Sequence, residues 1–430
     1  MKFRWLCFLA LVSPVALQAQ GGPTCDLGNS RQVYLAGGGA VMYLGGPVFN
    51  CNNGTTIHAD SGVYVQSTGR VDFMGSVRFD EADRALTSQY AQYVGRERRL
   101  MAQGNVVLTD KRDGSVLRAP ALDYFQKGGS NPEDRIEIYS GRPHATLYRK
   151  RSNNAAVIDT TNVDADRMTI LGQRAFRGFG NVQTVRGKLT TKSGYAEFDQ
   201  DSNYMKLHDH ALVQTDTFRL SADSIDADLV NGDEFKTLRA RRDVKLDGDQ
   251  VDVAAPRLRI EFVEGNVERT IAVGGARVAA DMPQATATSQ DFNLTADSID
   301  ALSPKQQLEK VIAVGGALGE RAPDSLDAKL PALIAKDWVR GDTVQAFFGA
   351  TEPDTARALQ RLVAVGNPAS STYKLREKVN DSTQISVNYL TARHIDVAFK
   401  EGAVDQVRAQ GDIRGLYLQP ARPEPSARTR

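Results

Sequence analysis

Residue types that commonly carry catalytic or metal chemistry are sparse in this chain. His208 and His210 stand two residues apart, a spacing that would put both rings on one face of a strand, as in some zinc sites. No third ligand is evident, and two solvent-exposed histidines on a strand are the alternative. The chain has only five His and three Cys in 430 residues. The glycine-flanked serine of hydrolases, the Gly-Lys-Ser/Thr phosphate loop, His-Glu-x-x-His and Cys-x-x-Cys are all missing from the sequence. We therefore expect no catalytic residue, no metal and no cofactor, and a protein that is not an enzyme.

The charged residues leave two other kinds of site open, a glycosidase site and a phosphate-binding site. Dispersed Asp and Glu could pair as glycosidase carboxylates on a solenoid face. The arginines of Glu97–Arg99 and Arg239–Arg242 could meet a phosphate, although such runs are usually solvated. Against this, 53 Lys+Arg balance 52 Asp+Glu. A protein that reads nucleic acid needs a clear basic excess, so we expect no nucleic-acid partner.

The first nineteen residues are typical of a secretory signal peptide. Lys2 and Arg4 precede an apolar stretch from Trp5 to Leu17, and Ala19 stands at a plausible cleavage position. The apolar stretch is too short to span a bilayer comfortably, although an uncleaved anchor is the alternative. We expect an exported protein, in the periplasm or peripheral to the outer membrane.

The two cysteines beyond the signal segment are candidates for a disulfide. Cys25 and Cys51 are an even pair in an oxidising compartment, where disulfides persist. The alternative is two unpaired thiols. A bridge would tie the N-terminal end of the fold, with no role in chemistry.

The body of the chain is a degenerate repeat. One signature, apolar-Ala-x-Gly-[Gly/Asn/Asp], recurs at intervals of about 30 to 50 residues, as in Met101–Asn105, Ile271–Gly275 and Ile312–Gly316. The second, Ala-Asp-x-apolar-x-Ala, is identical over six residues at Ala222–Ala227 and Ala296–Ala301. Self-similarity at such a period indicates a stacked array, here of about ten units.

Each repeat predicts bent antiparallel strands. Apolar residues alternate from Phe218 to Ala222, and the alternation then slips by one before resuming at Ile225. An odd step reverses the inward face unless the chain bends or bulges there. We expect a corner at the Ala-Asp-Ser position and a second corner at the glycine signature. Only Ser325–Trp338 and Asp354–Leu362 favour helix.

The alternating signatures resemble the OstA-like family, the periplasmic bridge proteins of lipopolysaccharide transport. Met101–Leu108 and Leu117–Tyr124 match best, followed by Thr56–Tyr64 and Ser221–Leu229, and the likeness spans most of residues 30–417. The resemblance implies an extended, repetitive antiparallel β-jellyroll, shaped like a folded taco, which agrees with the bent strands. The predicted fold class is therefore all-β, with about ten two-strand repeats.

The resemblance also implies a function. The chain would hold lipid acyl chains in an apolar β-groove, carry lipopolysaccharide or a related glycolipid toward the outer membrane, and join other OstA-like components by edge-strand addition. Candidate groove residues are inward-alternating apolar positions, for which plain core packing is the alternative. They are Val106, Leu108, Ile225, Ala227, Leu258, Ile260, Ile271, Val273, Ile299 and Ile312. Two other functions stay open: an envelope scaffold that binds proteins through its strand edges, and a carbohydrate-active solenoid enzyme.

Four segments organise the chain on this interpretation. Residues 1–19 are the signal peptide, and 20–320 are the first part of the repeat array. Residues 321–418 continue the repeats with a long insertion. Residues 419–430 are rich in Pro and Arg and are predicted to be disordered.

Overall fold

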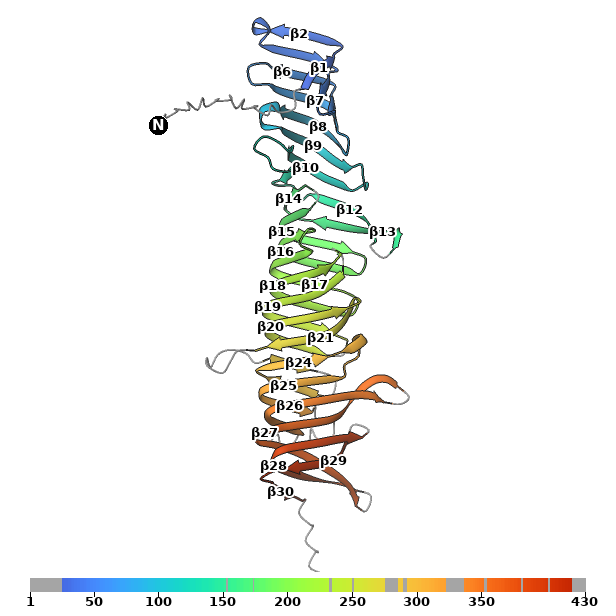
Figure 1. Cartoon of the computed structure of the whole chain (residues 1–430), viewed down its shortest axis with the longest axis vertical. Helices are drawn as coiled ribbons and strands as arrows, with labels where there is room; N and C mark the ends of the chain where they lie inside the picture. Colours follow the sequence, from blue (N-terminus) through green and yellow to red (C-terminus); the bar gives the residue numbers. More distant parts are fainter. Residues whose placement is uncertain are drawn as a thin grey trace, which may run out of the picture. The chain divides into compact units, whose positions relative to one another are not determined.

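The chain folds almost entirely as β-strand. The computed structural model describes residues 25–151, 154–172, 174–231, 234–249, 251–274, 285–288, 292–321, 336–351, 354–379, 382–400 and 403–419. These residues form thirty strands and three short 3-10 helices, with no α-helix (Figure 1). The predicted all-β, repetitive antiparallel fold is confirmed. No helix in this described part has the length and apolar character needed to cross a membrane.

Some predictions fall outside the described residues. These are the signal peptide, the tail from residue 420 onward, and most of the predicted helix Ser325–Trp338. The other predicted helix, Asp354–Leu362, is wrong, because this segment begins strand β27 (Asp354–Val379). Its residues pair with β26 (Trp338–Thr351), for example Leu362 with Ala346. Pairing to a neighbouring strand outweighs the weak helical preference of an Ala- and Arg-rich segment.

The strands fall into two compact units. Unit 1 comprises Met1–Gly141 with Ile170–Gly172, and unit 2 comprises Arg142–Thr169 with Gln173–Arg430. The first eleven strands are β1 (Cys25–Asn29), β2 (Gln32–Ala36), β3 (Val41–Gly45), β4 (Val48–Cys51), β5 (Thr56–His58), β6 (Ser61–Val65), β7 (Arg70–Asp80), β8 (Arg84–Val94), β9 (Arg99–Asp110), β10 (Val116–Phe125) and β11 (Arg135–Ile138). The next are β12 (His144–Arg151), β13 (Asn154–Asp164), β14 (Arg167–Leu171), β15 (Ala175–Arg186), β16 (Leu189–Asp199), β17 (Tyr204–Gln214), β18 (Phe218–Val230), β19 (Glu234–Gly248), β20 (Asp252–Val263) and β21 (Asn266–Val273). The last are β22 (Ala285–Thr288), β23 (Phe292–Ala296), β24 (Ser298–Leu302), β25 (Lys310–Arg321), β26, β27, β28 (Ser382–Lys400), β29 (Ala403–Gln410) and β30 (Arg414–Leu418). The 3-10 helices are η1 (Gly37–Gly39), η2 (Gly95–Glu97) and η3 (Pro304–Gln306).

Most long strands bend in the middle, so each unit has two arms. The register of β18 with β19 shifts between Ser221 and Ser224, at the predicted phase slip. Apolar residues on both sides of this shift, such as Leu220 and Ile225, are fully buried. The inward face is therefore kept through the bend, as the slip in the sequence predicted. We call the line of bends in a unit its crease.

The arms are defined by the crease. Arm A holds the strand segments on one side, such as Arg70–Met74 of β7 and Ser224–Val230 of β18. Arm B holds those on the other side, such as Val77–Asp80 and Phe218–Ser221. In unit 1 the arms face each other across a shared core. The Phe49 ring of arm B meets Phe73 of arm A at 5.4 Å between centroids.

Both repeat signatures lie on the same crease, so the predicted second corner is wrong. The glycine signature supplies two consecutive residues with positive φ, and the Ala-Asp signature of the adjacent strand faces them. Thus Gly180 (φ +73°) and Asn181 (φ +44°) lie beside Asp166, whose N–H donates to the Gly180 carbonyl at 2.9 Å. Equivalent left-handed pairs are Gly75–Ser76, Gly104–Asn105, Asp209–His210, Arg242–Asp243, Gly315–Gly316 and Gly411–Asp412. Glycine recurs here because left-handed backbone costs other residues about 1–2 kcal/mol.

Candidate functional site: the mouth between the arms

Seven of the ten predicted groove residues belong to the packed core between the arms. Val106 and Leu108 lie in unit 1, and the other five lie in unit 2. Their exposed fractions run from 0% to 7%. The five in unit 2 are Ile225, Ala227, Leu258, Ile260 and Ile299. Side chains this well covered contact other side chains of the protein, so they form the interior wall and leave no open groove along themselves.

The other three predicted groove residues lie on the opposite face of arm A. Ile271 and Val273 flank Ala272, which is the buried residue at 1% exposure. Ile312 likewise precedes the fully buried Ala313. Because side chains alternate along a strand, an inward Ala places its Ile and Val neighbours outward. The Ile-Ala-Val-Gly signature therefore presents its larger side chains on the outer face, where all three are half-buried.

The free ends of the arms, opposite the crease, face each other along what we call the mouth. In unit 2 the mouth is closed by aromatic side chains. Phe218 at the start of arm B meets Phe262 at the end of arm A, with ring centroids 5.9 Å apart. Phe235 of the neighbouring strand packs on Phe262 at 5.8 Å. The contacts within this aromatic cluster are apolar ring–ring contacts.

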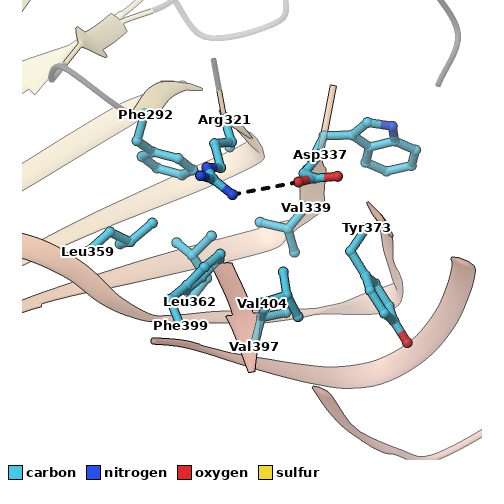
Figure 2. Close-up of a pocket in the computed structure, with 12 residues that line it drawn as sticks. Phe292, Arg321, Asp337, Val339, Leu359, Leu362, Tyr373, Val397, Phe399 and Val404 are labelled. Carbon is cyan, nitrogen blue, oxygen red and sulfur yellow. Dashed lines mark ion pairs between the residues drawn. The ribbon is translucent and has the colours of Figure 1, made fainter. Parts of the chain in front are cut away.

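Two small gaps interrupt the apolar mouth of unit 2. One, of about 10 Å³, lies between Val251 and Phe292 of arm B and Leu308 and Phe348 of arm A. The other, of about 20 Å³, also reaches Phe292 and is the pocket of Figure 2. A gap of this size holds at most about one water molecule, so the mouth is nearly filled by its own side chains.

Figure 2 shows how the larger gap is built. Its apolar wall comes from both arms: Phe292 and Val339 from arm B, and Leu359, Leu362, Val397, Phe399 and Val404 from arm A. Two charged residues, Arg321 and Asp337, also line it. Asp337 pairs with Arg321 at 4.0 Å and with the Lys374 ammonium at 3.0 Å. Tyr373 lies on the wall, and burial raises the pKa of its hydroxyl. The pocket is thus an apolar slot with one fixed ion-pair cluster at its rim.

The mouth of unit 1 is closed by a polar network. Glu81 lies in the turn between β7 and β8, at the free end of arm B. Its carboxylate accepts from the Tyr124 hydroxyl at 2.9 Å and from the Gln126 amide at 2.6 Å, both at the end of arm A. Arg84, at the start of β8, donates to Tyr124 at 3.0 Å and to Asp134 at 3.1 Å. Five polar side chains thereby join the arms across the mouth.

Burial sets the acid–base properties of this network. Desolvation raises the pKa of the Glu81 carboxyl, although the hydrogen bonds from Gln126 and Tyr124 act in the opposite direction. Burial and the nearby Glu81 carboxylate raise the pKa of Tyr124, and burial raises the pKa of Tyr93 to about 12. The tyrosines therefore stay protonated at physiological pH and serve as hydrogen-bond donors.

His208 and His210 do not lie on one face of a strand as a pair of ligands. Asp209 and His210 have φ of +62° and +58°, so they form the crease bulge and break the alternation after His208. The His208 ring packs at 6.1 Å from Tyr195, while His210 is exposed. Among the described residues no cluster of three or more His, Cys, Asp or Glu is arranged to hold a metal ion.

Arginines of the run at Arg239–Arg242 form ion pairs with carboxylates of the protein. Arg239 makes a two-pronged pair with Asp228, at 2.6 and 2.8 Å. Arg242 donates through Nε to Asp223, the acid of the Ala-Asp signature, at 2.8 Å. These contacts assign the run to ion pairing between neighbouring strands on an exposed face.

Strands at the two ends of the described chain present unpaired edges. At the N-terminal end, β1 pairs with β4 and the two are joined by the Cys25–Cys51 disulfide. The adjacent β2 pairs with β3 alone among the described residues, and Tyr34 on it is 69% exposed. At the C-terminal end, β30 pairs with β28 alone within the same described part, and Leu416 is 56% exposed.

Residues that sequence reasoning missed are those of the two mouths. Their signal is positional, because an aromatic or charged residue stands at the first or last position of a bent strand. Phe218 and Phe292 open their strands, Arg84 opens β8, and Phe262 is the penultimate residue of β20. Comparison with known proteins adds no assignment, since neither the protein-family models nor the curated proteins include a match to this chain.

Proposed function

We propose that the chain is a periplasmic, non-enzymatic lipid-binding bridge that takes acyl chains between the arms of unit 2. The observation that supports it best is the apolar mouth of that unit, from Phe218 to Val404. Aromatic and aliphatic side chains gather there at the side where the arms end. The ligand class is lipopolysaccharide or a related glycolipid, which the resemblance to the OstA-like family suggests.

Apolar closure of the mouth suits a reversible opening. The arms of unit 2 meet there through ring and aliphatic contacts such as Phe218 against Phe262. An acyl chain inserted between them would replace one apolar contact by another, and each CH₂ taken from water contributes about 0.8 kcal/mol. Opening would break no backbone hydrogen bond between the described strands, because their pairing runs along each arm and not across the mouth.

Exposed end strands support the bridging part of the proposal. Among the described residues, β2 and β30 each leave one edge without a partner, and such edges accept a further strand from another chain. Apolar residues on these strands, including Tyr34 and Leu416, would then become covered. Addition of another OstA-like component at these edges would extend the path for lipid.

The experiment compares the same substitution on the two faces of unit 2. Val404 lines the pocket of Figure 2 and is half-buried, so Val404→Asp puts a carboxylate at the proposed lipid path. Val365 lies on the outer face at 42% exposure, so Val365→Asp is the matched control. Mature proteins are purified from an envelope fraction, and bound lipid is quantified by native mass spectrometry. We expect the control to keep its lipid and Val404→Asp to lose most of it.

Two outcomes would contradict the proposal. A folded wild-type protein without any copurified lipid, and without uptake of added glycolipid, would exclude the carrier function. Equal lipid content in the two variants would show that the mouth is not the path. The scaffold alternative is tested with the same preparations, because β30 edge variants should lose a protein partner while their lipid content stays unchanged. An activity screen on polysaccharides tests the enzyme alternative.

A further inference from the structure

The two mouths are built from opposite chemistry. In unit 2 the closing contacts are apolar, while in unit 1 buried polar groups cross from one arm to the other. Arg84 and Tyr124 are 5% and 2% exposed. A buried charged group left without its partner costs several kcal/mol. The polar network therefore resists separation of the two arms. Apolar contacts between arms resist it less, because a bound acyl chain can replace them with other apolar contacts.

We infer that Glu81, Arg84 and Tyr124 latch the arms of unit 1 at its mouth, so that this unit stays closed and lateral entry of an acyl chain is limited to unit 2. The latching itself is independent of the proposed function, and only the statement about entry rests on it.

The Tyr124 hydroxyl is the centre of the latch. It accepts from Arg84 and donates to Glu81, so it uses both of its hydrogen-bonding roles across the mouth. Its ring lies 6.0 Å from Phe79 of arm B in an edge-to-face contact and below the Arg84 guanidinium at 5.5 Å. The same side chain thus joins the apolar core of the arms to the polar closure at their ends.

Further bonds fix the partners of the latch. Asp134, which takes the second bond from Arg84, also accepts the Lys127 backbone N–H at 2.7 Å. Thr55, from the turn before β5 in arm B, donates to Glu81 at 3.4 Å. To part the arms, the protein would have to break these bonds to Glu81, which is half-buried, and to Gln126, which is 5% exposed. Opening at this mouth is therefore costly.

Distances between the arms test the latch directly. Spin labels are placed on exposed tips of unit 1 with Ala82→Cys on arm B and Arg96→Cys on arm A, in a chain carrying Cys7→Ser. A second pair, Asp249→Cys and Glu264→Cys, reports on the mouth of unit 2 in the same way. We expect a narrow distance distribution in unit 1 that added lipid does not move, and a lipid-dependent shift in unit 2.

Variants that disrupt the latch are then compared with a control variant that removes a hydrogen-bonded carboxylate elsewhere in unit 1. Glu81→Leu, and the milder Tyr124→Phe that keeps the ring, should shift the unit 1 distribution to longer distances. Asp72 is the control, because it accepts from Tyr90 at 2.8 Å and Gln92 at 2.7 Å, all within arm A. Asp72→Leu should leave the distance between the arms unchanged. Unchanged distances in both latch variants, or an equal shift in the control, would overturn the latch.

A photoreactive fatty acid tests where acyl chains enter. With diazirine-bearing palmitate, we expect cross-linked peptides from unit 2 in the wild type and additional ones from unit 1 in Tyr124→Phe. Equal labelling of the two units in the wild type would overturn the limit on entry. No labelling of either unit in folded protein would refute the lipid function and the limit on entry together, while the spin-label distances would still decide the latch.

Discussion

Gly180 at the crease of unit 2 offers a quantitative test of how the repeat bends. Its φ of +73° is left-handed, and a Cβ added there would lie 2.5 Å from an Asp166 carboxylate oxygen and 3.0 Å from the Asp166 Cβ. Gly187, in the turn that follows, is the matched control. Its φ is +55°, but an added Cβ would meet nothing within 4 Å.

Both substitutions by alanine carry the same backbone cost, and only one carries the steric cost. A left-handed alanine costs about 1–2 kcal/mol, which is the expected loss for Gly187→Ala. At Gly180 the added methyl displaces Asp166, which holds the Asn181 amide at 2.8 Å and the Gly180 carbonyl at 2.9 Å. Overpacking of this kind adds about 1–3 kcal/mol. We therefore expect Gly180→Ala to cost about 2–5 kcal/mol in all.

Local hydrogen exchange is the suitable assay, because a repeat array need not unfold in one step. Exchange of peptides covering β15 and β16 is followed by mass spectrometry in increasing urea, and the free energy of opening is compared among the wild type and the two variants. If Gly187→Ala loses as much as Gly180→Ala, or if Gly180→Ala loses nothing, close packing of Asp166 against the glycine is not what fixes the crease.

Three further predictions concern other contacts. Cys25→Ser should lower the stability of unit 1 by about 2–4 kcal/mol, because Cys51 would no longer close a loop with a sequence separation of 26, and thermal melts with and without reductant would show it. The exposed pair of Asp223 with Arg242 should contribute at most about 1 kcal/mol, and exchanging the two residues should restore most of the loss caused by Asp223→Arg alone in a double-mutant cycle. Because burial raises the pKa of Glu81 in the folded state, that state binds the proton more tightly than the unfolded chain does. The free energy of unfolding should fall as pH rises from about 4.5, the ordinary value, through the raised pKa. A flat profile for the wild type in urea titrations, or the same slope in Glu81→Gln, would contradict this.

At the crease of unit 2, one ion pair occurs with its acidic and basic residues in exchanged positions, which makes the repeat harder to recognise in the sequence. At Ala222-Asp223 the acid belongs to the Ala-Asp signature, and Arg242 of the next strand pairs with it. At the last bend along this crease, Arg393 takes the place of the acid and donates to the Asp412 carboxylate at 2.6 Å. The ion pair is present at both bends, although the acid and the arginine have exchanged positions.

The distinction between core and lipid path also depends on the structure. Ile225 and Ile299 alternate inward as the sequence predicts, yet exposures of 0% and 1% show that they are core. An aspartate at either position would bury an unpaired charge and threaten folding, so it could not report on lipid. Residues at the mouth, such as Val404, are the informative positions because they are half-buried at the ends of the arms.

Local properties of the chain were sufficient to predict most strands and the bend at the Ala-Asp signature, but they wrongly favoured a helix at Asp354–Leu362 and a second corner at the glycine signature. A period of two, a single slip in that period, and glycine beside Asn, Asp or Gly each act within a few residues, so they can be read without knowing any partner. Alternation also predicted the burial of Val106 and Leu108. It could not tell that Ile271 faces outward, because inward and outward faces of a strand that is apolar on both sides look alike in one dimension.

Contacts between distant segments were decided only by the tertiary structure. Glu81 meets Tyr124 across 43 residues, and Arg84 meets Asp134 across 50. No periodicity links such positions, since they become neighbours only when the bend brings the free ends of two arms together. The same folding step places Phe218 against Phe262 in unit 2. The sequence by itself therefore determined that the strands fold over, and the packing of their ends decided that one mouth is closed by a polar network and the other by apolar contacts.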